Sequence, residues 1–335
     1  MNKLTDSRRL PKVFIIILNW ENAPDTVECL DSVFKLKSDD YQVVVCDNAS
    51  KDGSKAVIVD WLTQHKHSIQ VVDESGLDSF TSPVGAEVVF IGNEQNYGYA
   101  GGNNRGLRYA LVAGTDQDFV WIINNDTTFD PEALNKLLEE AARRPEIGFF
   151  GSTILDFSNH SKIQTQGGDR FYPWFGMSRH IGEGRNLEDQ FPQAVVESRM
   201  GYVVGASVFV RLATVAKIGL MEEGYFLYFE EVDWATRARR MGIKLGYAPT
   251  SLIYHKEGGT IGTSAFARRK SLLADFYGVK NRIVMTRHLF PWLLPTVYLA
   301  MLFTLAKRLL TGQFDRALMV LSIMLGIAKR PGEPS

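Results

Sequence analysis

Three short, mostly apolar runs, each followed at once by asparagine or aspartate, constrain this chain more than any other feature. They are residues 13–18, 42–46 and 119–123. A run of this kind predicts a strand of a parallel sheet that is covered on both faces. Because ligands of open α/β sheets bind at the carboxyl ends of the strands, we expect the polar residues that follow the runs to form a site.

Helical spacing between the runs indicates that helices return over the sheet. Residues 27–37 follow that spacing, and further helices are expected at residues 54–64 and from near Gly102. With another strand at residues 87–91, this alternation of strand and helix predicts a right-handed, mostly parallel sheet.

Other segments are less regular. Residues 66–86 show no clear period and are expected to be a surface insertion, whereas residues 171–200 are rich in glycine, aromatic and charged residues and are expected to be a long functional loop or lid. Further strands are expected at residues 149–155, 163–168, 203–210, 243–248 and 251–255, and helices at residues 212–218 and up to Met241.

Length and composition set broad limits. The 335 residues are enough for one large domain with an appendage, or for two domains. The net charge is -1, but 11 of the 37 lysines and arginines lie in residues 264–335, which makes an acidic body with a basic tail. Cys29 and Cys46 lie in apolar segments, indicate neither a disulfide framework nor a metal cluster, and fit a reducing cytosol. Only six apolar residues follow the polar residues 1–12, so we expect no signal peptide.

Asp126, flanked by Asn124 and Asn125 at the end of the third run, is a candidate ligand for a divalent cation bound to phosphate, because hard cations prefer oxygen ligands. The alternative is a polar turn that caps the next helix. Asp130 and Pro131 already supply an N-cap with proline at the first helical position, so Asp126 is not needed for that role.

A glycine-rich segment, residues 92–106, follows the strand at residues 87–91. Its glycines let backbone approach a ligand, and a helix that starts near Gly102 would offer free N–H groups to an anion. The spacing is neither that of a dinucleotide-binding loop nor that of a P-loop, so this segment alone is a weak indication.

Glu230, Glu231 and Asp233 lie at a predicted helix start beside aromatic residues. They could simply complement the helix dipole, which favours acids in the first turn. Alternatively, one of them is a general base in a partly dry site, where burial and like charge raise the pKa of a carboxylate. His255, taken alone, is more often a packed histidine than a ligand.

Taken together and in order, these motifs resemble the family 2 inverting glycosyltransferases with a GT-A fold, especially the bacterial rhamnosyltransferase-like branch. The resemblance covers roughly residues 13–260. It rests on the sequences at residues 18–20, 45–54, 96–106, 124–126, 205–206 and 226–233, and on His255 followed by Gly258 and Gly259.

The resemblance implies where a nucleotide-sugar donor binds. Asn19 would line the nucleotide pocket, Asp47 would hydrogen-bond a pyrimidine such as uracil or thymine, and Asn124 would contact the ribose or deoxyribose. The full set of donor-binding residues that it implies is Asn19, Asp47, Asn48, Gly101, Asn104, Arg105, Asn124 and Asn125.

The resemblance also implies the metal site and the base. Asp126 and His255 would coordinate Mg²⁺ or Mn²⁺, and the imidazole tilts the choice slightly toward Mn²⁺. The family's usual catalytic aspartate is replaced here by Glu231, which keeps a carboxylate but adds one methylene of reach. Glu230 and Asp233 therefore remain alternatives, and Glu231 is favoured.

The tail carries two apolar runs, residues 289–306 and 317–328, with basic residues beside them. Eighteen residues is the lower limit for a membrane span, and Pro291 and Pro295 interrupt the first run early. Basic clusters favour an anionic cytoplasmic leaflet, so we expect helices that lie in or on the membrane interface. A true span, or a helical pair that packs against the body or forms a homodimer, are the alternatives.

We therefore expect an α/β GT-A domain at residues 1–263 and a helical appendage at residues 264–335. The expected activity is inverting transfer of a hexose or deoxyhexose, such as rhamnose, from a dTDP- or UDP-sugar to a lipid-linked glycan at the inner membrane, for cell-surface polysaccharide such as O-antigen. Residues 166–200 would set acceptor specificity, and no nucleic acid is expected. A non-catalytic sugar-nucleotide-binding scaffold is one alternative. A sugar nucleotidylyltransferase is another, but residues 19–22 lack its glycine-rich basic loop.

Overall fold

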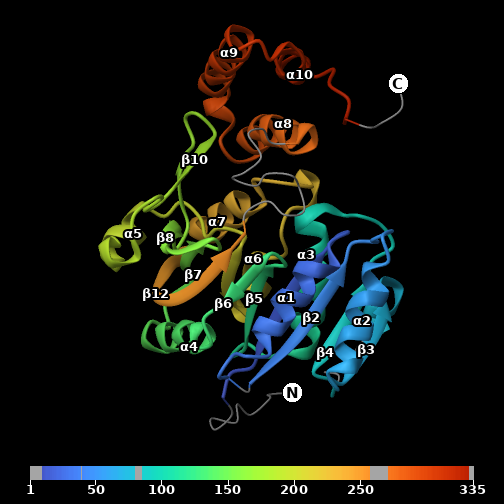
Figure 1. Ribbon diagram of the computed structural model, residues 1–335. Coiled ribbons are helices and arrows are strands. Elements are labelled where there is room, and N and C mark those ends of the chain that lie inside the picture. Colours follow the sequence, from blue (N-terminus) through green and yellow to red (C-terminus); the bar gives the residue numbers. More distant parts are fainter. Residues whose placement is uncertain (1–9, 39, 80–84, 257–270, 332–335) are drawn as a thin grey trace.

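The computed structural model of the protein describes residues 10–38, 40–79, 85–256 and 271–331. Its centre is a ten-stranded mixed sheet in the order β3-β4-β2-β1-β5-β11-β7-β12-β6, with β8 paired to β7 (Figure 1). The strands are β1 (Val13–Asn19), β2 (Tyr41–Asp47), β3 (Ile69–Asp73), β4 (Val88–Gly92), β5 (Phe119–Asn124), β6 (Thr127–Phe129), β7 (Ile147–Asp156), β8 (Asn159–Gln166), β11 (Ser207–Arg211) and β12 (Lys244–His255), and β9 (Asp169–Tyr172) and β10 (Met177–His180) form a separate hairpin.

The first half of the sheet is parallel, as the sequence predicts. β1 pairs in parallel with β2 and β5, and β4 pairs in parallel with β2 and β3. β11 then runs antiparallel between β5 and β7, whereas β12 is parallel to β7 and antiparallel to β6. The expected α/β fold with a mostly parallel sheet and C-terminal helices is confirmed.

Helices cover both faces of this sheet, which explains the unbroken apolar runs. Val13, Ile15 and Ile17 of β1 belong to the core on one face, and Phe14 and Ile16 to the core on the other. The first core is closed by α1 (Ala23–Val33), α2 (Ser54–Gln64) and α4 (Ala133–Arg143), and the second by α3 (Gly98–Ala113), α5 (Gln193–Arg199), α6 (Leu212–Ile218) and α7 (Glu230–Arg240). A strand covered on both faces has no polar side, so its sequence shows no alternation.

Two segments that the sequence indicates to be irregular are in fact structured. Residues 66–86 were expected to be an insertion, but they contain β3, which extends the sheet beyond β4, and a 3₁₀ helix, Glu74–Ser79. β3 is an edge strand with half-exposed side chains, so it lacks the apolar run of a central strand. Residues 171–200 likewise hold most of the β9–β10 hairpin, a 3₁₀ helix at Leu187–Asp189, and α5.

Element boundaries also differ from the expectation. Helix α3 begins at Gly98, four residues before Gly102, and α4 begins at Ala133, where Asp130 caps only the preceding turn by accepting a hydrogen bond from the Glu132 N–H at 2.9 Å. The two strands expected at residues 243–255 are one strand, β12, whose register shifts between Ala248 and Leu252.

The segment that leads into α7 is strained. Phe226, Tyr228 and Phe229 all have positive φ angles, 63°, 67° and 78°, in a region that L-residues avoid. Gly98 makes room for this segment: a Cβ there would lie 2.0 Å from the Phe226 carbonyl oxygen. That carbonyl accepts a hydrogen bond from the Tyr99 N–H at 2.8 Å, which ties the start of α3 to the strained segment.

Three helices follow the α/β body: α8 (Leu272–Leu289), α9 (Leu294–Leu310) and α10 (Phe314–Met324), with a 3₁₀ turn, Pro291–Leu293, between α8 and α9. The expected boundary between residues 263 and 264 lies outside the described residues. The sequence predicts the apolar runs of α9 and α10, but it does not predict α8. Asp275 of α8 forms ion pairs with Arg308 of α9 and Arg316 of α10, at 2.6 and 2.7 Å. Part of the tail's basic charge therefore holds these three helices together.

Helix α8 is joined to the strained segment by one side chain. The fully buried Asn281 donates hydrogen bonds to the carbonyl oxygens of Tyr225 and Leu227, both at 2.7 Å, and of Tyr228 at 3.2 Å. Met285 and Leu289 of the same helix lie in one apolar cluster with Val232 of α7. Helix α8 is thus a packed part of the body.

We predict that Asn281→Ala lowers the free energy of unfolding by about 1–3 kcal/mol, because it leaves buried carbonyl groups without a donor. Lys280→Ala, on the exposed side of the same helix, is the matched control and should change it by less than about 0.5 kcal/mol. Urea unfolding of the two variants measures the difference. Equal losses would show that Asn281 does not hold the segment.

Candidate active site

The polar residues that follow the apolar runs meet at one edge of the sheet. Asn19 is the register partner of Asp47 between β1 and β2, and Leu18 is the partner of Asn124 between β1 and β5. Strands β2, β1 and β5 are neighbours, so these three polar residues line one edge at their carboxyl ends. The structure thus brings the three residues together, and their role in a site stays a prediction.

A buried hydrogen-bond network connects the polar side chains at the ends of β1 and β2. Asp47 Oδ1 accepts hydrogen bonds from Asn19 Nδ2 and from the Ser50 hydroxyl, both at 2.6 Å. Asn19 Oδ1 in turn accepts from the Thr26 hydroxyl at 2.7 Å, and Asn125 Nδ2 donates to that hydroxyl at 3.0 Å. A carboxylate held by several donors has a fixed orientation, which suits recognition of a ring N–H.

Other residues of the expected donor site are engaged within the protein. Asn48 bonds to Asn93 and to the carbonyl of Gly98, and Asn104 bonds to both the N–H and the carbonyl of Met221. Gly101, buried in α3, accepts a hydrogen bond from the Arg105 guanidinium through its carbonyl. These contacts hold α3 in place.

Arg105 makes the strongest of these contacts. Its guanidinium forms ion pairs with Glu74 at 2.7 Å and Glu223 at 3.1 Å, and stacks 3.6 Å from the ring centre of Tyr97. Donor contacts by Asn48, Gly101, Asn104 and Arg105 stay a prediction. The anion site expected near Gly102 is wrong in its location, because the helix begins earlier and the Gly102 N–H lies inside it.

Asp126 and His255 lie side by side, although 129 residues separate them in the chain. Asp126 Oδ1 is 3.2 Å from His255 Nε2, and both side chains are largely buried. His255 Nδ1 lies 2.9 Å from Gln164 Oε1, which can accept a hydrogen bond from an Nδ1 proton, and Nε2 faces Asp126.

This arrangement fits a divalent cation. A carboxylate oxygen and an imidazole nitrogen, the latter oriented by an outer hydrogen bond, are usual metal ligands. Within the described part of the chain, no group of three or more histidine, cysteine or acidic residues could hold a metal. Two protein ligands would leave several positions of a cation such as Mg²⁺ or Mn²⁺ for phosphate oxygens.

Glu231 lies at the same edge, beside the end of β5. The Asn124 N–H donates to the Ala206 carbonyl at 3.2 Å, and a Cβ on the neighbouring Gly205 would lie 2.3 Å from Glu231 Oε1. The same Cβ would lie 2.9 Å from the hydroxyl of Tyr99, which donates to the Gly205 carbonyl at 2.7 Å. Glycine at position 205 therefore lets the carboxylate approach the sheet edge.

The protein raises the proton affinity of Glu231. Burial raises its pKa to about 7, the negative charge of Asp169 adds to this, and the N–H groups of Glu231 itself and of Gly205 partly offset it. A carboxylate with a pKa near neutral is suited to take a proton from a hydroxyl group.

The two alternative bases are less suited. Glu230 is buried, and burial together with the charge of Glu231 raises its pKa well above its usual value, which disfavours the charged form that a base needs. Asp233 is fully buried, forms an ion pair with Arg237 at 2.6 Å and accepts a hydrogen bond from Tyr225 at 3.1 Å. These contacts favour Glu231, whose side chain is partly exposed.

Several residues near the site were not singled out from the sequence. Asp169 Oδ1 lies 2.6 Å from His180 Nδ1, and its other oxygen accepts from the Tyr202 hydroxyl at 2.9 Å. Gln164 orients His255 from the neighbouring segment, β8. Asp169 and His180 lie on a hairpin without an apolar alternation, so no local pattern indicates that Asp169 lies near Glu231.

Two family models match the chain. The model described as glycosyl transferase family 2 matches residues 13–193, and the one described as glycosyl transferase family group 2 matches residues 119–328. The first match spans more than half of the chain and includes Asn19, Asp47, Asn124 and Asp126.

Similar curated proteins are distant in sequence. A Haloferax volcanii protein named low-salt glycan biosynthesis hexosyltransferase Agl10 is 22% identical over 84% of this chain and 77% of its own length. The Mycobacterium tuberculosis N-acetylglucosaminyl-diphospho-decaprenol L-rhamnosyltransferase is 23% identical over 74% and 77%. Rhamnosyltransferase WbbL of Escherichia coli is 23% identical over 82% and 96%.

Solved structures share the fold. The mannosyltransferase PcManGT from Pyrobaculum calidifontis, in complex with GDP-Man and Mn²⁺, superposes with a TM-score of 0.55 at 15% identity, over 96% of this chain and 88% of that one. GalNAc-T7 with UDP, GalNAc and Mn²⁺ gives 0.59 at 14% identity, over 84% of this chain and 48% of that one. The chain has the GT-A fold and belongs to glycosyl transferase family 2.

Proposed function

We propose that this enzyme transfers a hexose or deoxyhexose, such as rhamnose, from a dTDP- or UDP-sugar to a hydroxyl group of a lipid-linked glycan, with inversion at the anomeric carbon. The observation that carries the proposal is that Glu231 lies at the same sheet edge as the Asp126–His255 pair and the Asp47 network. The names of the hexosyl- and rhamnosyltransferases among the relatives support this class of substrate.

Each group has a distinct part in the reaction. Asp47 accepts a hydrogen bond from the pyrimidine N–H, and Asn124 contacts the sugar of the nucleoside. A Mg²⁺ or Mn²⁺ ion held by Asp126 and His255 would neutralise charge on the leaving nucleoside diphosphate. Glu231 removes the proton of the acceptor hydroxyl as its oxygen attacks the anomeric carbon from the side opposite the diphosphate. A single displacement inverts the configuration there.

We predict that Glu231→Gln lowers the turnover number at least about 100-fold, because the amide cannot accept the proton. Binding of the nucleotide donor, measured by thermal shift with Mn²⁺ after a screen of UDP-, dTDP- and GDP-sugars, should be unchanged. In the native enzyme the base acts deprotonated, so turnover should rise with pH through about 7 and fall below it. Release of nucleoside diphosphate measures both effects.

Glu230→Gln is the isosteric control for this experiment. Burial and the charge of Glu231 raise the pKa of Glu230 and favour its neutral form, so its amide analogue should keep the same acid limb of the pH profile. Full turnover in Glu231→Gln would refute the assignment of the base. A native protein that releases no nucleoside diphosphate from any donor would favour the alternative of a non-catalytic scaffold.

We predict that Gly205→Ala lowers the turnover number about 10- to 100-fold, since the added methyl group would overlap Glu231 Oε1 and the Tyr99 hydroxyl and displace the base. Gly76→Ala is the control, because a Cβ at Gly76 has no neighbour within 4 Å. Steady-state kinetics of the two variants should show a lower kcat for Gly205→Ala alone. Equal kcat values would mean that the base is not seated against Gly205.

We also propose that helices α9 and α10 lie at the inner surface of the cell membrane. One described segment, Pro291–Leu310, is long and apolar enough to cross a membrane by length and composition, and only 17% of its apolar window is buried. Figure 1 shows α9 and α10 beyond α8, at the end of the molecule opposite α4. Their large apolar side chains are exposed: Leu299, Leu302, Phe303, Leu309, Leu310, Phe314, Leu318 and Leu321.

A lipid interface explains this exposure better than water does. Apolar side chains clustered on two adjacent helices, beside basic residues, are typical of helices that lie in the headgroup region of anionic membranes. An acceptor linked to a lipid would be reached there. A helix that spans the membrane and a contact with a second copy of the chain are the alternatives.

We predict that Phe303→Gln/Leu318→Gln lowers binding to vesicles with anionic phosphatidylglycerol about tenfold or more, because burial of each side chain contributes about 1.5–3 kcal/mol. Val57→Gln/Val71→Gln, two exposed apolar residues on α2 and β3, is the control and should bind like the native protein. Co-flotation with vesicles measures binding. Equal flotation of all three proteins would contradict an interfacial role for α9 and α10.

A further inference from the structure

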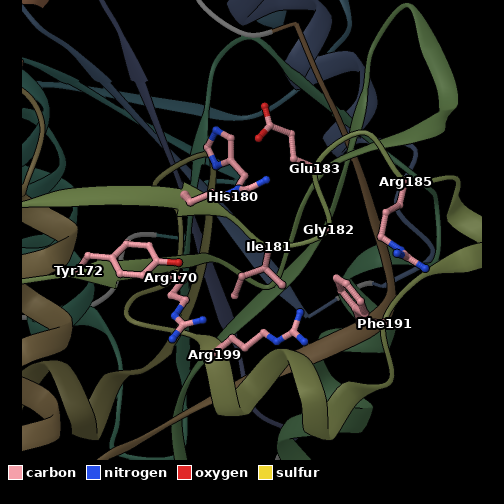
Figure 2. Close-up of a pocket in the computed structure, with 10 residues that line it drawn as sticks. Arg170, Tyr172, His180, Ile181, Gly182, Glu183, Arg185, Phe191 and Arg199 are labelled. Carbon is pink, nitrogen blue, oxygen red and sulfur yellow. The ribbon is translucent and has the colours of Figure 1, made fainter.

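A cavity of about 340 Å³ lies between the β9–β10 hairpin, the segment that follows it, and α5 (Figure 2). Four arginines line it: Arg170, Arg179, Arg185 and Arg199. Glu183 is the one carboxylate among the lining residues. The volume is in the usual range for a ligand site, and the lining is strongly cationic.

Two of the arginines lie opposite each other, although their like charges repel. Arg170 on β9 and Arg179 on β10 are direct cross-strand partners. Like charges opposite each other in an antiparallel pair are destabilising. Within the described part of the chain, none of the four arginines forms an ion pair with a carboxylate. All four are exposed to solvent, so their guanidinium groups are accessible to an anion from outside the protein.

The other two arginines are held in position by an aromatic ring. The guanidinium carbons of Arg185 and Arg199 lie 4.3 and 4.5 Å from the ring centre of Phe191, and Figure 2 shows both side chains directed toward that ring. Arg185 also donates from Nε to the Asp189 carbonyl at 2.7 Å. Stacking on a ring pre-orients guanidinium groups, which can then bind phosphate oxygens through paired N–H groups.

The cavity adjoins the base through an ion pair. His180, which lines the cavity, contacts Asp169 at 2.6 Å, and the charge of Asp169 acts on the Glu231 carboxylate. At the far end of the same hairpin, Trp174, Phe175 and Met177 are exposed, and Gly176 lies against Arg282 of α8. The hairpin therefore runs from Asp169, near the proposed base, to α8, the helix that precedes the exposed apolar helices α9 and α10.

We propose that this arginine cavity binds the diphosphate of a polyprenyl-diphosphate-linked acceptor, an inference that rests on the proposed function. The donor's diphosphate belongs at the Asp126–His255 pair, where a cation would carry its charge. The cavity, which lies against the hairpin that reaches from Asp169 to α8, instead offers four guanidinium groups against one carboxylate, that of Glu183. An acceptor held there would have its diphosphate at the arginines, its sugar toward Glu231 and its prenyl chain toward the exposed hairpin tip.

The test uses the full-length protein with farnesyl diphosphate as the probe, measured by titration calorimetry with EDTA present and again with saturating dTDP and Mn²⁺. The native protein should bind the probe in both conditions and should not bind farnesol. Arg170→Gln/Arg179→Gln should bind it at least about tenfold more weakly, because charged hydrogen bonds contribute about 1.5–3 kcal/mol each. Lys217→Gln/Lys244→Gln, two exposed cations outside the cavity, removes equal charge and should bind it like the native protein.

Three outcomes would overturn the proposal: equal affinity in the arginine variant and the native protein, an equal loss in the lysine control, or complete displacement of the probe by dTDP and Mn²⁺. Folding is checked separately, since removal of two opposed like charges should leave the melting temperature of the unliganded variant equal or higher. Release of nucleoside diphosphate from the donor tests the proposed function independently. Loss of that activity with intact probe binding would refute the transferase but keep the diphosphate site.

Discussion

The pairing of β6 with β12 is the constraint on which the site depends. β6 follows Asp126 immediately, and its first residue, Thr127, is the register partner of His255 at the end of β12. The Asp126 carbonyl also accepts a hydrogen bond from the Lys256 N–H at 3.0 Å. Backbone pairing thus brings an imidazole from a late strand beside a carboxylate of the central sheet, and no flexible loop is needed to join them. Such pre-organisation is what a metal site requires, because its ligands must meet within a few tenths of an ångström.

The proposed base, Glu231, follows a backbone segment that is strained. Three non-glycine residues within four positions, Phe226, Tyr228 and Phe229, have positive φ angles and turn the chain sharply just before α7. Each costs of order 1–3 kcal/mol and persists only where other contacts impose it. Here Asn281 and the start of α3 impose it. Helix α8 is therefore part of the structure that positions Glu231, and it is joined to α9 and α10, which carry the surface proposed to meet the membrane.

The sequence predicts the fold and the site to different extents. The strands β1, β2 and β5 could be recognised because both faces are buried and the residues before their polar ends are mostly apolar, and their ends identified Asn19, Asp47 and Asp126. The edge strand β3 and the β9–β10 hairpin could not, since their side chains are half exposed or charged. The family resemblance, and no local pattern, pointed to His255 and Glu231. The ion pair of Asp233 with Arg237, which makes Asp233 less suited as a base, is visible only in the structure, because the sequence does not show which residues Arg237 contacts. No local sequence pattern indicates Asp169 or His180, because their position near the site depends on contacts that form only in the folded chain.

Asp169 lies near both Glu231, the proposed base, and the cavity lined by arginines. Four guanidinium groups close to a carboxylate would lower its pKa and weaken it as a base. Asp169 contacts His180, which lines the cavity, at 2.6 Å and accepts a hydrogen bond from Tyr202. Its negative charge adds to the effect of burial in raising the pKa of Glu231. This carboxylate therefore opposes the effect of the arginines on the proposed base, so that an anion-binding cavity on the β9–β10 hairpin can lie near a carboxylate of high proton affinity.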